Sequence, residues 1–555
     1  MAAGSSSGAS SYQRYPFGVE VIEAQTYIRS KRFRVVHVIQ RFPLLFLGGL
    51  ALVPRLYNLG VSTIGVHAWR QADTAAMARN FYVRSQQTYG LSSLSQYLYP
   101  QVDWGGGGYA ETEFPIYPAI VSWIYRFTGD HPAYARLVTL LFSLLGLYFL
   151  YRLIELCFDR SVAFWSALFY AISPVSVFYG RTIQPESLVM MSTIGALYFF
   201  QRWLNEEKSL DLVISWGLGA IAFLTKVLPL VYLGIPLLFL AIVKYKWRIF
   251  RRLELWIYAS TLLAVTFAWY YHAHQIYLDT GLTFGFWSDD TDRYTWIDLL
   301  SVKYWGDILL RLAVRHFAVF GFVVALVGLT YKRRQAADYL WEVGLVSSLM
   351  ANAIAPTSSY VHEYYQLPVM LYGLVFIGKV YGRAISLEPS AARIDSGRPD
   401  SGRPDNGRKS RRSRPWLIAA LILTFIASSA IYTLDYMRPE NAEASKAYQL
   451  AQQIQAQTPP DAKVLAVTGG DPSLLYLADR KGWLIQPTEV SAQRLEAASA
   501  DGAEFIVGSY EIIQSYAPFE DESQKANIRD VLSGQCTPLI NNETIFISPL
   551  PCAAQ

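Results

Sequence analysis

Charged side chains are scarce in this sequence. Asp, Glu, Lys and Arg together make up 16% of the 555 residues, whereas they approach about a quarter of an ordinary soluble protein. A soluble chain of this length would also divide into several domains joined by polar linkers. The 52% share of hydrophobic residues therefore excludes an ordinary soluble protein. The first dozen residues are small and polar, so they resemble neither a signal peptide nor a membrane span.

The apolar residues gather in runs long enough to cross the ~30 Å hydrocarbon core of a bilayer. One such run is compatible with a buried core helix, but many of them predict a mostly α, polytopic bundle of transmembrane helices. The run 116–127 is too short to cross and is interpreted as a helix lying at the membrane surface. About eleven crossings are predicted, at 36–57, 133–155, 161–180, 187–204, 211–226, 228–243, 253–271, 310–330, 338–355, 366–382 and 416–434.

Basic residues indicate the orientation, because short cytoplasmic loops carry an excess of Lys and Arg. Lys31, Arg32 and Arg34 precede the first predicted span, which places residues 1–35 in the cytoplasm. The later basic turns fall on the same side, and an odd number of crossings leaves the C-terminus outside. We therefore expect a multi-pass protein of the plasma (inner) membrane with an extracytoplasmic C-terminus.

The segments outside the predicted spans differ in character. The basic linker repeats SGRPD in tandem and has too little apolar surface to fold, so it is predicted to be a disordered cytoplasmic segment. The C-terminal tail alternates short apolar strands with helical stretches, which predicts a small extracytoplasmic α/β domain. The predicted parts are a transmembrane module at 36–382 with outer loops 58–132 and 272–308, the linker 383–415, the last span 416–434 and the α/β domain 435–555.

Cysteine is rare, with three in the whole chain. Cys157 is predicted at a cytoplasmic end, where a free thiol is expected. Cys536 and Cys552 both belong to the outer tail, where oxidation is allowed. Either a disulfide joins these two residues or both are unpaired.

The first outer loop begins with HAWRQADTAAMARNFY, in which Asp73 is the single carboxylate. His67, Arg70 and Gln71 shortly precede it, and the stretch has helical character, so Arg70 and Gln71 lie about one turn from Asp73. An Asp that caps a helix start within a polar surface loop would leave the same pattern. Asp73 is therefore a candidate catalytic group with a structural alternative.

The same loop continues with YPQVDWGGGGYAETEFPIYP, which supplies Glu111 and Glu113 beside a four-glycine turn. Trp, Tyr and carboxylates are dense here. Sugar binding uses this combination, because apolar faces cover the ring and acceptors bind the hydroxyls. The density therefore favours a carbohydrate site over a simple polar loop.

Two charged motifs adjoin later predicted spans. In GRTIQPESLVMM, Arg181 and Glu186 bracket a turn, and the positive end of the following helix dipole would favour ionised Glu186. In FLTKVLP, Lys226 sits between two apolar runs, where a lysine either extends to the interface or meets an anion. A helix-start Glu and an interfacial Lys are also common for structural reasons.

Polar aromatic residues gather at the outer start of the span 366–382. In SSYVHEYYQLPVM, Tyr364 and Tyr365 have the composition of an interfacial belt, which does not explain the adjoining His362. The orientation derived from Lys and Arg alone turns all these motifs toward the outer face. Carboxylates with nearby cations suit a lipid phosphate donor, because the cations hold the phosphate and a carboxylate deprotonates an acceptor hydroxyl.

In these motifs and in its layout over about 36–380, the chain resembles membrane glycosyltransferases of the GT-C superfamily. Within that superfamily it resembles the family 39-like group, which is related to protein O-mannosyltransferases and aminoarabinose transferases. The resemblance implies a polyprenyl-phosphate sugar donor, inversion at the anomeric carbon, and Asp73 as the base. By motif, the family's second acidic position falls on Glu186, its lysine on Lys226, and its second first-loop motif on ETEFP with Glu113.

These observations predict an inverting transferase that moves a sugar to a glycan, lipid or protein acceptor at the outer face. Asp73, Glu186 and Glu113 are the candidate catalytic residues. The carboxylates and His67 leave a divalent cation open, but no spacing is diagnostic, so no metal or other cofactor is assigned. Membrane lipids are expected partners and nucleic acid is not. The predicted donor-phosphate and substrate contacts are Lys226, Arg70, Arg181, His67, Gln71, Glu111, His362, Tyr364 and Tyr365.

Two other classes remain open at this stage. A transporter or lipid flippase would show internal repeats and charges near the bilayer midplane, but the charges here gather at one face. A receptor-like binding protein with an outer sensor tail would leave the first-loop carboxylates without a role.

Overall fold

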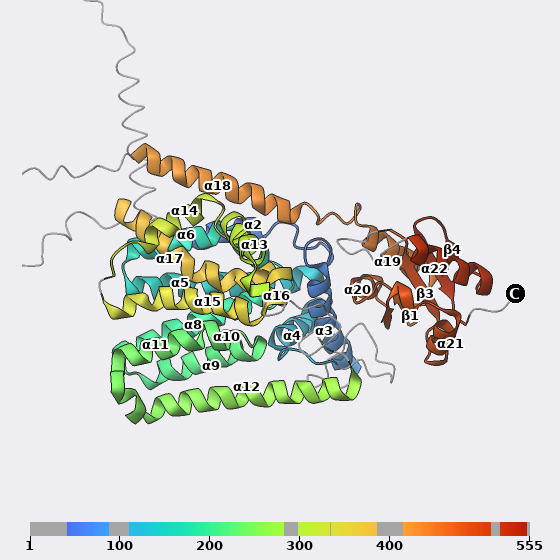
Figure 1. The fold of residues 1–555 in the computed structure, drawn as a ribbon, viewed down its shortest axis with the longest axis horizontal. Helices are drawn as coiled ribbons and strands as arrows, with labels where there is room; N and C mark the ends of the chain where they lie inside the picture. The colour runs from blue at the N-terminus through green and yellow to red at the C-terminus, as the bar shows by residue number, and fades with distance from the viewer. Residues whose placement is uncertain are drawn as a thin grey trace, which may run out of the picture.

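A computed structural model describes residues 41–87, 110–281, 283, 298–333, 335–385, 415–511 and 522–551. The predicted cytoplasmic segment 1–35, nearly all of the basic linker, the four-glycine turn and Cys552 lie outside these residues. Cys536 is disulfide-bonded, and Cys157 is a free cysteine. The described chain forms a helical bundle and a small α/β domain, which lie at opposite ends of the molecule (Figure 1).

Each predicted span coincides with one or two helices of the bundle. The helices α3 and α4 stand between the bundle and the α/β domain, and α18 runs along one side of the bundle toward that domain (Figure 1). The longer helices are α2 (Pro43–Arg55), α3 (Ala68–Gln87), α4 (Ile116–Thr128), α5 (Pro132–Cys157), α6 (Arg160–Ile172), α8 (Glu186–Glu206), α9 (Ser209–Thr225), α11 (Gly234–Tyr245), α12 (Leu253–Thr280), α13 (Val302–Arg311), α14 (Phe320–Leu329), α15 (Leu340–Ile354), α17 (Leu367–Ala384) and α18 (Pro415–Met437).

Short helical segments connect these elements at the places where the chain turns. They are α7 (Pro174–Tyr179), α10 (Pro229–Tyr232), η2 (Lys246–Arg251), η3 (Asp298–Leu300), the π-helical η4 (Leu312–His316), η5 (Ala336–Tyr339), α16 (Pro356–Val361) and η6 (Glu363–Gln366).

The number of membrane crossings differs between prediction and structure. Four helices among the described residues are long and apolar enough to cross a membrane, or five if a bent pair counts as one span. The predicted count of about eleven is therefore not confirmed. The predicted span 161–180 falls below this test because the structure splits it between α6 and α7. The predicted span 228–243 passes it as part of Pro229–Arg251, which comprises α10, α11 and η2.

The predicted span 310–330 is broken in the structure. The helix through His316 and α14 meet at 106°. The break passes through the π turn η4 and through Ala318 and Val319, whose φ angles are +47° and +60°. A β-branched residue with a positive φ is strained, so the bend is imposed by surrounding packing rather than by a glycine or proline.

Glycines let helices approach closely inside the bundle. A Cβ atom on Gly378 of α17 would lie 2.0 Å from the Ser166 hydroxyl of α6. A Cβ atom on Gly344 of α15 would lie 2.2 Å from the ring of Tyr372. Small residues at such contacts favour the association of helices in membranes, where packing rather than burial from water holds them together.

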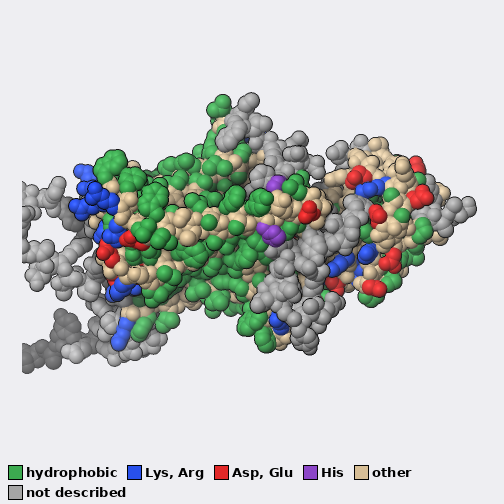
Figure 2. Space-filling view, turned by 90° about the horizontal axis from the view of Figure 1, so that it is seen from below, with side chains coloured by type: hydrophobic (Ala, Val, Ile, Leu, Met, Phe, Trp, Pro, Cys, Tyr) green, Lys and Arg blue, Asp and Glu red, His purple; other side chains and the backbone are tan. Residues whose placement is uncertain are grey.

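Charge is distributed unevenly along the bundle. In the face drawn in Figure 2, hydrophobic side chains cover the middle of the molecule, and Lys and Arg gather at the end away from the α/β domain. That end includes the basic segment η2. The distribution agrees with the basic turns from which the orientation was predicted.

The α/β domain is built on a five-stranded sheet of order β2-β1-β3-β5-β4. β1, β2 and β3 are parallel, whereas β5 is antiparallel to β3 and β4 is antiparallel to β5. Alternate strand residues face two separate cores, one with α19 and α20 and the other with α21 and α22. The elements are α19 (Lys446–Gln457), β1 (Lys463–Val467), α20 (Ser473–Ala478), β2 (Lys481–Ile485), η8 (Pro487–Glu489), α21 (Ala492–Ala500), β3 (Phe505–Ser509), α22 (Glu522–Gln535), β4 (Ile540–Asn541) and β5 (Ile545–Pro549).

The α/β domain packs directly on α3. Arg79 of α3 donates to the carboxylate of Asp479 at 2.9 Å and to the backbone oxygen of Tyr476 at 3.1 Å. Its guanidinium also lies 4.1 Å from the centre of the Tyr476 ring. On the bundle side, Arg79 forms an ion pair with Asp130. One arginine thus links the bundle, α3 and the α/β domain.

Candidate active site

Four charged side chains from separate segments meet at the base of α3. Lys226 Nζ lies 2.9 Å from Glu186 Oε1 and 3.7 Å from Glu113 Oε1. Arg70 forms an ion pair with the other oxygen of Glu113. Lys226 and Glu186 are 12% and 3% exposed, so water screens their attraction weakly. We call Arg70, Glu113, Glu186 and Lys226 the ion-pair cluster.

Local structure explains how the cluster assembles. Glu186 is the first residue of α8, after Pro185, so the positive end of the helix dipole faces its carboxylate. Lys226 follows the last residue of α9 in an extended conformation, before Pro229 starts α10. The backbone N–H of Phe114 donates to Leu224 at 2.9 Å, which brings Glu113 beside Lys226.

Aromatic rings cover the ion-pair cluster on one side. The ammonium of Lys226 lies 4.6 Å from the centre of the Tyr364 ring and 5.1 Å from that of Tyr365. The ring of His362 stacks on Tyr364 at 5.1 Å, and His67 meets Tyr364 edge-on at 5.4 Å. The segment His362–Tyr365 therefore forms an aromatic wall against the Lys226 side of the cluster.

Two histidines beside this wall are neutral at pH 7. Burial lowers the pKa of His67, despite the nearby carboxylates of Glu363 and Glu186. Burial, together with the charges of Lys226 and Arg70, lowers the pKa of His362 to about 3. Neutral imidazoles can accept or donate hydrogen bonds to sugar hydroxyls.

Asp73 lies on α3, close to the ion-pair cluster but outside its ion pairs. Its side chain is 2% exposed, and among the described residues its Oδ1 has no hydrogen-bond partner. Burial raises the pKa of the Asp73 carboxyl well above its usual range, and Asp471 and Glu113 add to the rise against the opposing charge of Arg70. A buried carboxylate without a full set of partners is expensive to keep, which is typical of functional groups.

The α/β domain contacts α3 close to Asp73. The loop after β1 contacts α3, since a Cβ atom on Gly470 would lie 3.0 Å from the Trp69 ring. Asp471 in this loop is buried and accepts from the backbone of Ser473 at 2.8 Å. The sequence motifs did not indicate Asp471, because its only local signature is that of a turn residue before a short helix.

Three predicted contacts belong neither to the ion-pair cluster nor to the aromatic rings that pack around Tyr364. Gln71 donates to the backbone oxygen of Val66 and accepts from the N–H of Ile183, so it ties α3 to the turn before α8. Glu111 accepts from the Thr283 hydroxyl at 2.6 Å and lies 3.7 Å from His274, at the far end of α12. Arg181 is the third.

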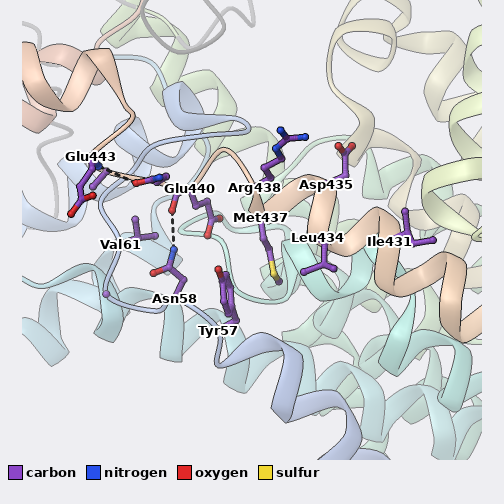
Figure 3. A pocket seen from close by; sticks show the side chains of 13 residues that line it. Tyr57, Asn58, Val61, Ile431, Leu434, Asp435, Met437, Arg438, Glu440 and Glu443 are labelled. Atoms are coloured by element: carbon purple, nitrogen blue, oxygen red, sulfur yellow. Dashed lines mark hydrogen bonds between the residues drawn. The ribbon is translucent and has the colours of Figure 1, made fainter.

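Arg181 forms a buried ion pair with Glu440, which follows α18. Its two terminal nitrogens lie 2.9 and 3.0 Å from the two carboxylate oxygens, and the side chains are 0% and 1% exposed. Beside the pair, a cavity of about 940 Å³ opens between the loop Tyr57–Val61 and the end of α18. Figure 3 shows Asn58 bonded to the backbone oxygen of Glu440 across it. Arg181 thus fastens the tail to the bundle.

Replacing Arg181 with Met should lower the free energy of unfolding by about 3–5 kcal/mol, because it leaves the Glu440 carboxylate buried without its cation. The double variant Arg181→Met/Glu440→Gln should recover most of that loss. Thermal unfolding of the purified proteins in detergent measures both. A double variant as unstable as the single one would show that the buried pair is not what holds this junction.

No metal cluster is apparent in the part of the chain that the structure describes. Within it, no group of three or more His, Cys, Asp or Glu side chains is arranged to hold a metal ion.

Comparison with known proteins finds one family model and several solved structures that match this chain. Residues 112–272, which include Glu113, Glu186 and Lys226, match the family described as dolichyl-phosphate-mannose-protein mannosyltransferase. The fold matches the apo crystal structure of ArnT from Cupriavidus metallidurans with a TM-score of 0.61 over 92% of this chain and 99% of that one, at 15% identity. Residues 112–272 therefore match this family model, and the chain as a whole has the fold of ArnT.

Other solved structures share this fold. ArnT from Cupriavidus metallidurans bound to undecaprenyl phosphate matches with a TM-score of 0.59, again at 15% identity over 92% of this chain and 99% of that one. The archaeal oligosaccharyltransferase AglB from Archaeoglobus fulgidus, in complex with an inhibitory peptide and a dolichol-phosphate, matches at 12% identity and a TM-score of 0.55. That match covers 85% of this chain and 70% of AglB. No curated protein sequence matches the chain.

Proposed function

We propose that this protein is an inverting glycosyltransferase that takes a sugar from a polyprenyl phosphate at the outer face of the plasma membrane. The observation that supports it most is the pairing of two different sites at the base of α3. One is the ion-pair cluster, whose two cations suit a phosphate. The other is the buried carboxylate of Asp73, whose Oδ1 has no hydrogen-bond partner among the described residues and which suits a general base.

In this proposal, Lys226 and Arg70 stabilise the phosphate as it leaves. At rest each cation faces a carboxylate, Glu186 or Glu113, which keeps it charged and in place inside a poorly solvated site. Such preorganised charges stabilise a developing anion without further rearrangement. Arg181 is assigned to the junction with the tail.

The reaction then proceeds in one displacement. The acceptor hydroxyl attacks the anomeric carbon while Asp73 takes its proton, and the bond from that carbon to the phosphate oxygen breaks. The polyprenyl phosphate leaves with the electron pair, and the configuration inverts. In this proposal, the sugar ring packs against the rings of His67, His362, Tyr364 and Tyr365, which contact one another.

The donor class is supported by the relatives, since ArnT was solved with undecaprenyl phosphate and AglB with a dolichol-phosphate. The proposal does not assign the acceptor, which is a lipid, a glycan or a protein. Incubation of the purified protein with radiolabelled polyprenyl-phosphate hexoses and pentoses tests the proposal. Transfer to an added acceptor, or slow hydrolysis without one, is expected for one donor. Intact donors throughout the panel would contradict it.

The orientation is a separate prediction. The basic end of the bundle should face the cytoplasm, and the α/β domain with the site should lie outside. Single cysteines placed at exposed positions, for example Gln453→Cys in α19 and Lys246→Cys in η2, can be labelled in intact cells with an impermeant maleimide. The first should react from outside and the second only after permeabilisation. The reverse pattern would contradict the outer-face site.

A further inference from the structure

A second cavity, of about 540 Å³, opens beside His67 on the side of the bundle formed by α13 and α16. His67 connects it to the ion-pair cluster, because its ring contacts Tyr364, which in turn covers Lys226. The cavity itself has its own cations. Arg311 and Arg315 line it from the end of α13 and from η4.

The backbone around this cavity is strained. His67, at its edge, has a φ of +52°. Arg315 lies in a π turn, just before the positive φ angles of Ala318 and Val319. Strained residues and π turns persist where surrounding structure holds them, and they concentrate at binding sites. Broken helices likewise line ligand sites in membrane proteins.

The two arginines are differently engaged. Arg311 donates to the backbone oxygens of Ser359 and Tyr360 at 3.3 and 2.9 Å, and forms no ion pair with a carboxylate among the described residues. Arg315 lies 3.0 Å from Glu363, yet its side chain stays 41% exposed. Glu363 also accepts from two buried tyrosine hydroxyls. Asp307 also lines the cavity, where its carboxylate accepts from the Tyr360 hydroxyl at 2.7 Å rather than forming an ion pair with Arg311. Both guanidiniums therefore keep N–H groups that a ligand can use.

The rim of the cavity is apolar and outward-facing. Leu310 and Val361 are 63% and 57% exposed, and Val314 lies between the two arginines on the lining. Exposed apolar residues next to the guanidiniums of Arg311 and Arg315 fit a molecule that is anionic at one end and a hydrocarbon at the other. Free phosphate would use only the arginines.

We propose that this cavity is a second phosphate-binding site, for the headgroup of a lipid phosphate, separate from the ion-pair cluster. Arg311 and Arg315 bind the phosphate oxygens, and the lipid chain leaves across Leu310, Val314 and Val361. The two sources of this chemistry are a polyprenyl phosphate and an anionic membrane phospholipid. The proposal concerns lipid binding alone, so it can be tested whether or not the protein transfers a sugar.

Native mass spectrometry of the full-length protein in detergent tests the site. Undecaprenyl phosphate, phosphatidylglycerol, zwitterionic phosphatidylcholine and inorganic phosphate are titrated separately. One of the two anionic lipids should bind more tightly than phosphatidylcholine, and which one does so identifies the source. Arg311→Gln and Arg315→Gln should each weaken that binding by about 10- to 100-fold, as expected for the loss of a charged hydrogen bond.

Arg152→Gln is the matched control, because Arg152 is also 41% exposed and paired with a glutamate, but at the basic end of the bundle. It should bind the lipids as the unmodified protein does. Arg315→Lys guards against misfolding of the Gln variants, since it keeps the charge and should retain part of the affinity. Equal binding by Arg311→Gln, Arg315→Gln and Arg152→Gln would overturn the site. Tighter binding of inorganic phosphate than of either anionic lipid would contradict the proposal that the ligand is a lipid.

Discussion

Asp73→Asn should lower the rate of sugar transfer by about 10²–10⁴-fold, the usual loss when a general base is removed. The protein should be no less stable, because Asn has the same size and no charge to bury at a site where Oδ1 has no partner among the described residues. Single-turnover kinetics with labelled donor measure the rate, and thermal unfolding measures the stability.

The pH dependence of the same variant adds a second test. The folded-state pKa of Asp73 is raised, so its stabilising contribution is complete below about pH 3.9, the ordinary pKa of Asp, and is lost as the pH rises through the folded value. Catalysis needs the ionised form, so the rate should rise over that same raised range. Asp73→Asn should lose both effects, and an acidic limb near the ordinary pKa would show that Asp73 is not the base.

Asp159→Asn is the control for the structural alternative. Asp159 caps α6, where its side chain accepts from the backbone of Val162 at 2.8 Å. Its replacement should change stability by about 1 kcal/mol or less and leave the rate unchanged. If Asp73→Asn behaves in the same way, Asp73 has only a local structural role, and Glu113 or Glu186 becomes the better candidate base.

Lys226→Met should have the second-largest effect, on both activity and stability. It leaves Glu186, which is 3% exposed, without its cation, and breaking a buried pair in this way costs about 3–5 kcal/mol. It also removes a cation proposed to stabilise the leaving phosphate. The double variant Lys226→Met/Glu186→Gln should recover stability but not transfer, because the phosphate still lacks its charge partner.

Arg202→Met provides the comparison for Lys226. Arg202 pairs with the buried Asp211 at 3.3 Å, at the opposite ends of α8 and α9 from the ion-pair cluster. It should lose stability and keep its activity per folded molecule. Normal transfer by the double variant of Lys226 and Glu186 would rule out Lys226 as the phosphate contact.

The helices of the bundle were largely predictable from the sequence, because long apolar runs have few alternatives in a membrane. The number of crossings was not. The run 310–330 reads as one span, but the structure bends it by 106°. Composition alone does not reveal that bend, since Ala318 and Val319 are ordinary apolar residues whose positive φ angles come from tertiary packing. Arg311 and Arg315 within the run were the available warning, because charges inside a span are rare.

The site was predictable in its residue types but not in its pairings. Glu186 and Lys226 were each recognisable as costly charges beside apolar runs, yet nothing local shows that they meet at 2.9 Å. The same holds for Arg181, whose partner Glu440 is distant in sequence and lies beyond the basic linker. The Arg181–Glu440 contact depends on how the tail packs on the bundle, and the hydrophobic pattern within one segment does not encode that packing.

One measurement tests the central claim most directly. Purified protein is reconstituted in proteoliposomes that carry a labelled polyprenyl-phosphate sugar identified from the donor panel, and the fate of the lipid and the sugar is followed separately. Enzymatic transfer predicts that the sugar separates from the polyprenyl phosphate, with inverted anomeric configuration in the product, and that Asp73→Asn abolishes this cleavage. Movement of the intact lipid between leaflets without cleavage would contradict the account and identify a flippase instead.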